Sequence, residues 1–136
     1  MNVFFYRNVD AYKLAKELTK SIYQLLLKFP VEERHALTDQ IRRAAISIPA
    51  NIAEGLGRFS IKERIHFLDF SYGSLTEVLC EMEIAHDNHY ISDEEFAAID
   101  QLASRVSMTI YGLKKSLENK KTNKIISITK SEDTLV

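Results

Sequence analysis

Apolar residues recur every three or four positions through four stretches of this chain, at residues 9–29, 36–56, 61–88 and 93–118. That spacing places the apolar side chains of each stretch on one face of an α-helix. Glycine and proline are scarce, as expected for a chain made mostly of helices. Because the connections between the stretches are short, they predict an all-α fold, an up-down-up-down antiparallel four-helix bundle.

Local signals mark the ends of the predicted helices. Pro30 ends the first one, because proline cannot continue the hydrogen-bond ladder. Ser60 with Glu63, and Ser92 with Glu95, have the S-x-x-E spacing of a capping box, in which two side chains satisfy amides at a helix start. These pairs predict the beginnings of the third and fourth helices.

The end of the chain has a different composition. Residues 120–136 are polar apart from a short run at Ile125–Ile128. A segment with so few apolar residues cannot bury enough surface to fold alone. We therefore expect a bundle domain at residues 1–119 and a C-terminal tail at 120–136 that is disordered unless a partner orders it.

Pro49 lies inside the second apolar stretch. A proline there removes one helical hydrogen bond and crowds the carbonyl of Ala45. Ile52 and Leu56 nevertheless continue the apolar stripe in phase, so the helix is predicted to run past Pro49 with a kink. The bend either belongs to a core helix alone or also shapes a binding or assembly surface.

Apolar residues also occur on the faces of the second and third helices that point away from the core. A helix that is apolar on both sides is usually buried on both sides. Large apolar residues facing outward favour a subunit contact over chance exposure. The residues expected at an oligomer interface are Ile46, Pro49, Ala50, Ala53, Phe70 and Ile84.

Polar residues line the flank between these two helices. They could form an interhelical hydrogen-bond network that fixes the register of the helices. They could equally form a polar surface at an interface or in a ligand groove. The residues of this structural polar network are Arg43, Asn51, Glu54, Glu77 and Glu81.

The formal net charge of −1 conceals an uneven distribution: residues 61–119 hold five basic and eleven acidic side chains. This is not the uniformly basic domain of a strong nucleic-acid binder. A lysine row on the first helix is either a solvated face or a stripe that follows phosphates. The candidate nucleic-acid contacts are Lys13, Lys16, Lys20, Arg42, Arg43 and Arg58.

The sequence favours no catalytic chemistry. Three Glu-x-x-His pairs occur, but a di-metal bundle site needs such a motif on two facing helices and an inward glutamate from each of the others. There is no nucleophile motif, P-loop or glycine-rich phosphate cradle. We expect neither an enzyme nor a bound metal, cofactor or small-molecule substrate.

The single cysteine, Cys80, is expected near the core, where it would be an inert thiol in a reducing compartment. No signal peptide is visible, and no apolar run approaches the ~20 residues that a membrane span requires. These features predict a soluble cytoplasmic protein that does not enter a membrane.

The run R-R-A-A-I-S-I-P-A-N-I-A-E-G at Arg42–Gly55 resembles the signature of the 23S rRNA intervening-sequence proteins, a bacterial family. The run F-L-D-F-S-Y-G-S-L-T-E-V at Phe67–Val78 and the F-P-x-E-E turn at Phe29–Glu33 extend the resemblance. It covers the chain from about Asn8 to Glu118.

This resemblance implies a small four-helix bundle that assembles as a ring-shaped homopentamer. Genes of similar proteins lie in insertions within 23S rRNA genes and also elsewhere. A related bundle is the accessory protein of diversity-generating retroelements, implicated in binding nucleic acid and reverse transcriptase. By resemblance, the chain is a non-enzymatic assembly module whose partner is RNA or a ribonucleoprotein. The alternative is a protein-binding scaffold with no nucleic-acid role.

Overall fold

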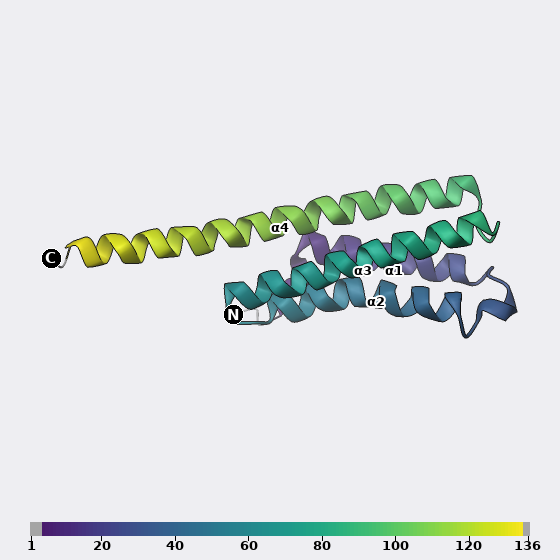
Figure 1. The fold of residues 1–136 in the computed structure, drawn as a ribbon, viewed down its shortest axis with the longest axis horizontal. Helices are drawn as coiled ribbons and strands as arrows, with labels where there is room; N and C mark the ends of the chain where they lie inside the picture. The colour runs from purple at the N-terminus through teal and green to yellow at the C-terminus, as the bar shows by residue number, and fades with distance from the viewer. Residues whose placement is uncertain (1–3, 135–136) are drawn as a thin grey trace.

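A computed structural model describes residues 4–134 of the 136-residue chain, apart from the side chains of residues 124, 125 and 130–134. Four helices run up and down along one axis (Figure 1). Two short 3-10 turns, η1 (Phe5–Asn8) and η2 (Val31–Glu33), precede and follow the first helix. The long helices are α1 (Asp10–Leu26), α2 (Leu37–Leu56), α3 (Ile61–Asp87) and α4 (Asp93–Thr134). The predicted all-α four-helix bundle is confirmed.

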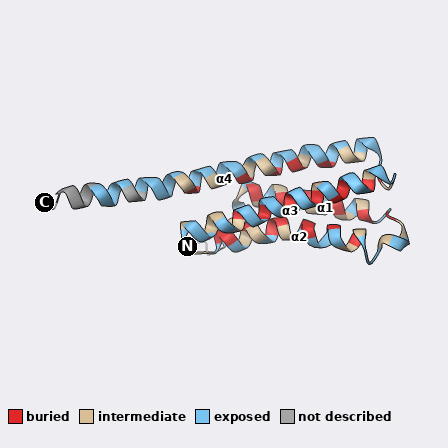
Figure 2. Ribbon diagram, viewed as in Figure 1, coloured by how far each residue is buried: buried red, intermediate tan, exposed pale blue. Residues whose placement is uncertain are grey.

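The core is formed by the sides of the four helices that face one another (Figure 2). The stripes predicted for α1, α2 and α4 lie against this core. The stripe predicted for α3 also lies against the core, with one exception: the residues buried in it or packed on it are Ile61, Ile65, Leu68, Ser71, Leu75, Leu79 and Met82. Tyr72, which was predicted in the same stripe, is 49% exposed.

The α2 helix continues through Pro49, as predicted. Because proline has no N–H, the carbonyl of Ala45 loses its helical donor. Thr19 of α1 offers a replacement, because its Oγ1 hydroxyl lies 3.0 Å from the Ala45 oxygen and 2.9 Å from the Ala15 oxygen of its own helix, so the two carbonyls share its proton. Ser71 of α3 donates to the carbonyl of Ile48 at 2.8 Å. The neighbouring helices thus supply hydrogen bonds to the carbonyls around the proline.

Close packing between α2 and α3 depends on Gly55. A Cβ atom at this position would lie 2.7 Å from Cβ of Phe67 and 3.2 Å from the carbonyl oxygen of Arg64. The first distance is shorter than real contacts allow, so a side chain here would push the two helices apart. A small residue therefore sets the spacing of this helix pair.

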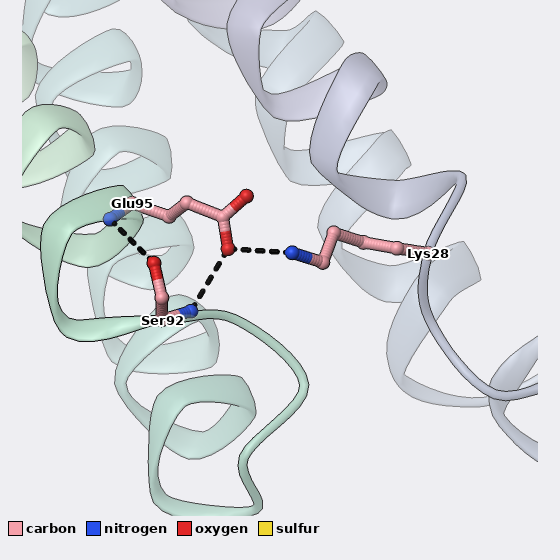
Figure 3. Close-up of polar contacts among 3 residues, drawn as sticks. All are labelled: Lys28, Ser92 and Glu95. Carbon is pink, nitrogen blue, oxygen red and sulfur yellow. Dashed lines mark hydrogen bonds and ion pairs between the residues drawn. The ribbon is translucent and has the colours of Figure 1, made fainter.

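A three-residue contact ties the end of α1 to the start of α4 (Figure 3). The amide of Glu95 donates to Oγ of Ser92 at 3.1 Å, and the amide of Ser92 donates to Oε1 of Glu95 at 2.9 Å. This reciprocal pair is the predicted capping box. Lys28 reaches the same Oε1 atom at 2.7 Å, and this hydrogen bond is the main cause that lowers the pKa of Glu95.

The α4 helix is longer than predicted. Leu117 is the last buried residue among its described side chains, yet the helix runs on to Thr134 and leaves the bundle (Figure 1). The sequence was expected to form a tail without structure after residue 119. The difference arises because no glycine or proline follows Gly112, so nothing in the sequence stops the helix. We call residues 118–134 the C-terminal arm.

Candidate assembly and nucleic-acid surfaces

Large apolar residues are exposed on the outward faces of α2 and α3, as they are at other places on the bundle. Ile46 is 46% exposed on α2, and Phe70 and Ile84 are 50% and 44% exposed on α3. Ala50 is exposed and Ala53 is half-buried. Five of the six residues predicted for an oligomer interface therefore retain accessible surface.

Pro49 is the exception, because it is buried within the chain's own core. Its ring lies on the inner side of α2, so it shapes the helix and presents no surface to a partner. The prediction that Pro49 lies at an interface is wrong for this reason. Gly73 of α3, in contrast, has open space around it, since a Cβ built there would meet no atom within 4 Å.

The seam between α2 and α3 is joined by hydroxyl groups. The Oγ atoms of Ser47 and Ser74 are hydrogen-bonded at 2.8 Å. Asn51 donates to both the carbonyl and Oγ of Ser47, at 2.8 and 2.9 Å. Of the predicted polar network, Asn51 is the residue that supports this interhelical link. The serine pair was missed because a serine in a helix gives no sequence signal of a partner on another helix.

The two arginine–carboxylate contacts of this flank are local. Arg43 pairs with Asp39 at 2.9 Å and Arg58 pairs with Glu54 at 2.6 Å, each one turn away on α2. The expected single network is therefore replaced by separate contacts, because each arginine finds a carboxylate on its own helix. Both pairs are solvent-exposed, so each contributes little to stability.

Glu77 and Glu81 form a carboxyl pair on α3. Glu81 is 6% exposed, and its Oε2 atom has no hydrogen-bond partner within the described part of the chain. Burial, together with the hydrogen bond and the negative charge of Glu77, raises the pKa of Glu81 to about 7. A carboxyl group that holds a proton near neutral pH thus lies beside exposed Glu77, which falls between Phe70 and Ile84 in the sequence.

The predicted nucleic-acid contacts do not form one patch. Lys13, Lys16 and Lys20 are exposed on α1, where Lys16 lies 5.4 Å from the centre of the Tyr12 ring. Arg42 and Arg43 lie near the beginning of α2, whereas Arg58 follows its end. At 1.5 Å per residue, these arginines are separated by roughly 23 Å along the helix axis.

Several grooves flank α4, and large or charged side chains line them. The first, of about 440 Å³, lies between α3 and α4 and includes Tyr72 and Tyr111 beside an ion pair of 2.8 Å between Lys114 and Asp69. The hydrogen bond to Asp69 raises the pKa of Lys114. The second, of about 540 Å³, lies between α1 and α4 and includes Lys13. Sequence reasoning missed the first groove because Tyr72 was expected in the core.

Two further features concern chemistry at the surface. Cys80 is exposed, so the expectation of a thiol near the core is wrong; it lies beside the buried stripe of α3 and not within it. His86 of one Glu-x-x-His pair contacts Asp93 at 2.6 Å and stacks on Phe96.

Within residues 4–134, no group of three or more metal-binding side chains gathers at one place among the side chains that the structure describes. No helix in this part of the chain is long and apolar enough to cross a membrane.

A sequence profile of the 23S rRNA-intervening sequence protein family matches residues 7–127. The chain belongs to this family. The match includes all of α1, α2 and α3 and continues along α4 into the C-terminal arm.

A solved structure has a similar fold. A crystal structure of an S23 ribosomal protein family member of unknown function, from Bacteroides thetaiotaomicron VPI-5482, is similar with a TM-score of 0.70. The two chains are 24% identical, and the similarity covers 77% of this chain and 98% of that one. This likeness supports the fold. No curated protein matches the chain.

Proposed function

We propose that the protein is a non-enzymatic assembly module that forms a homo-oligomer through α2 and α3 and binds RNA or a ribonucleoprotein. The observation that carries the proposal is the exposed apolar face formed by Ile46 and Ala50 of α2 and by Phe70 and Ile84 of α3. Monomeric proteins rarely leave such a surface uncovered. By family resemblance the assembly is a ring of five subunits.

The composition of this face suits another helix of the same chain. Large residues alternate with small ones, and Gly73 has open space around the position of its missing Cβ. A backbone can approach closely at such a residue, while Phe70 supplies apolar area on the same helix. The face is also fixed in shape, because the Ser47–Ser74 hydrogen bond joins its two helices.

RNA is the partner that the family suggests, since the name of the family refers to the intervening sequences of 23S rRNA. The exposed lysines and arginines of the bundle support contact with phosphates. The many carboxylates of α3 and α4 mean that the surface is not basic throughout. A protein-binding scaffold without RNA is the second candidate, favoured by the same apolar α2–α3 face.

The oligomer is tested by light scattering on the wild type and on Phe70→Glu. We expect a multiple of the chain mass for the wild type and smaller, equally helical particles for Phe70→Glu. Met108→Glu is the matched control, because Met108 is 72% exposed on α4 and lies outside the proposed face. A monomeric wild type, or an unchanged mass for Phe70→Glu, would contradict this assembly.

The RNA part is tested separately with the same wild-type sample. A fluorescently labelled single-stranded RNA from a 23S rRNA sequence should bind, and its affinity should fall steeply as salt rises. An oligomer that ignores RNA at low salt would leave the scaffold as the better function.

A further inference from the structure

Charge is separated along the axis of the bundle. Residues 77–100, from the end of α3 to the start of α4, hold eight carboxylates and no lysine or arginine. Residues 114–131 hold six lysines and one glutamate. Because α4 runs the full length of the bundle, these two segments lie at opposite ends of it (Figure 1). The arm therefore leaves the bundle at the end remote from the acidic segment.

The face of α4 that packs on the bundle changes character where the bundle ends. Ile110 and Leu117 are buried on that face. The same three- and four-residue spacing continues beyond Leu117 at positions 120, 121 and 124, which are all lysines. Lys120 and Lys121 are exposed. The apolar stripe is thus followed by a lysine row, and these lysines would lose hydration if they packed against an apolar helix surface.

Ile126 and Ile128, the isoleucines of the arm whose side chains are described, do not share a face. They are two positions apart, so they point to nearly opposite sides of a helix. Ile126 and Ile128 are 46% and 51% exposed. A helix of about this length that packs on nothing is only marginally stable in water. A partner that neutralises the lysines would stabilise it.

An exposed aromatic residue lies at the same end of the bundle. Phe59, in the connection between α2 and α3, is completely exposed. The connection lies at the end from which the arm projects (Figure 1). Single-stranded RNA is commonly held by lysines on its phosphates together with aromatic rings on which bases stack. Both kinds of group occur here.

We infer that the C-terminal arm and Phe59 form the RNA-binding surface of this protein. Lysines of the arm contact the phosphates of single-stranded RNA, and the ring of Phe59 stacks on a base. The inference rests on the RNA-binding part of the proposed function. It places that function on the arm, rather than on the α1 lysine row or on the arginines of α2.

RNA is a better partner for the arm than a protein surface is. This holds also for the acidic end of a second copy of the chain. Two helices associate in water mainly through an apolar seam, and Ile126 and Ile128 of the arm do not line up in one. Exposed ion pairs alone contribute only about 0–1 kcal/mol each. Phosphates bound by several lysines gain the additional free energy of counterion release.

The test compares two variants of the full chain with equal loss of charge. One carries Lys120→Gln, Lys121→Gln and Lys124→Gln; the other carries Lys13→Gln, Lys16→Gln and Lys20→Gln. Glutamine keeps helix propensity close to that of lysine. The probe is a fluorescein-labelled single-stranded 23S-derived RNA, followed by fluorescence anisotropy over a series of KCl concentrations, with the mass of each sample measured by light scattering.

The arm variant should lose affinity on the order of 100-fold near 0.1 M salt, and its log–log salt slope should fall by about 2, because each lost phosphate contact contributes about 0.7. The α1 variant should change the affinity less than threefold. An arm variant that binds as the wild type does would overturn the inference and leave RNA binding intact. A wild type that binds no RNA would overturn both. Loss of oligomer mass in the arm variant, with RNA affinity unchanged, would assign the arm to a second copy instead.

Discussion

The hydrogen bond from Thr19 to the carbonyl of Ala45 is expected to contribute measurably to stability. Thr19→Val removes the hydroxyl and keeps the branched shape of the side chain. Ala45 is fully buried and Pro49 offers its carbonyl no N–H, so the substitution leaves the oxygen without this donor. An unsatisfied buried acceptor costs about 1–3 kcal/mol. For a chain of this size that corresponds to a fall in Tm of roughly 3–10 °C.

A double-mutant cycle with Pro49→Ala isolates this effect. Residue 49 then regains an N–H one turn beyond Ala45, so the carbonyl has a helical donor. Thr19→Val should cost less in that background, by about 1 kcal/mol or more. Both costs are measured by urea denaturation followed by circular dichroism. Equal costs in the two backgrounds would refute the reasoning.

Ser71→Ala is the matched control for this cycle. Its hydroxyl donates to the carbonyl of Ile48, but residue 52 is not a proline and can donate to the same oxygen. The cost of Ser71→Ala should therefore be the same with Pro49 and with Pro49→Ala.

Two further predictions concern stability. Gly55→Ala should destabilise the fold by about 1–3 kcal/mol, because the new Cβ clashes with Phe67. Gly112→Ala should stabilise it by up to about 1 kcal/mol, because no atom lies within 4 Å of the new Cβ. Denaturation midpoints of the two variants that move in the same direction would contradict this. Because the folded-state pKa of Glu81 is raised to about 7, the folded chain binds this proton more tightly than the unfolded chain does, so stability should fall as pH rises from about 4.5 to 7. Glu81→Gln should reduce this dependence and gain roughly 2–3 kcal/mol at pH 8; a wild type and variant with parallel pH profiles would contradict it.

Much of the fold was predictable because its signals are local. The capping box of Ser92 and Glu95 places the start of α4 correctly, and the in-phase stripe beyond Pro49 predicts that α2 continues. The position of Tyr72 on α3 was less predictable. A residue at the edge of an apolar stripe is buried or exposed according to how the neighbouring helices pack, and Tyr72 lies 49% exposed in the groove between α3 and α4.

The candidate surfaces were predictable only in part. Outward apolar residues such as Phe70 are recognisable from helical spacing. The partners of polar residues are not, because several candidates are within reach and geometry selects among them, as it does when Arg43 pairs with Asp39. The arm was missed because its composition indicates disorder, while its helical state is a continuation of α4.

The continuity of α4 has a mechanical consequence. The helix has 42 residues and therefore a length of about 63 Å. No glycine or proline follows Gly112, so an arm that a partner holds helical has no hinge and moves with the part of α4 that is packed in the bundle. A tilt of a few degrees where Glu95 anchors the helix to Lys28 would displace the far end by several ångströms. A small rotation of α4 within the bundle thus becomes a large displacement of the arm. The spacing of the α4 helices in an assembly would set the spacing of the arms.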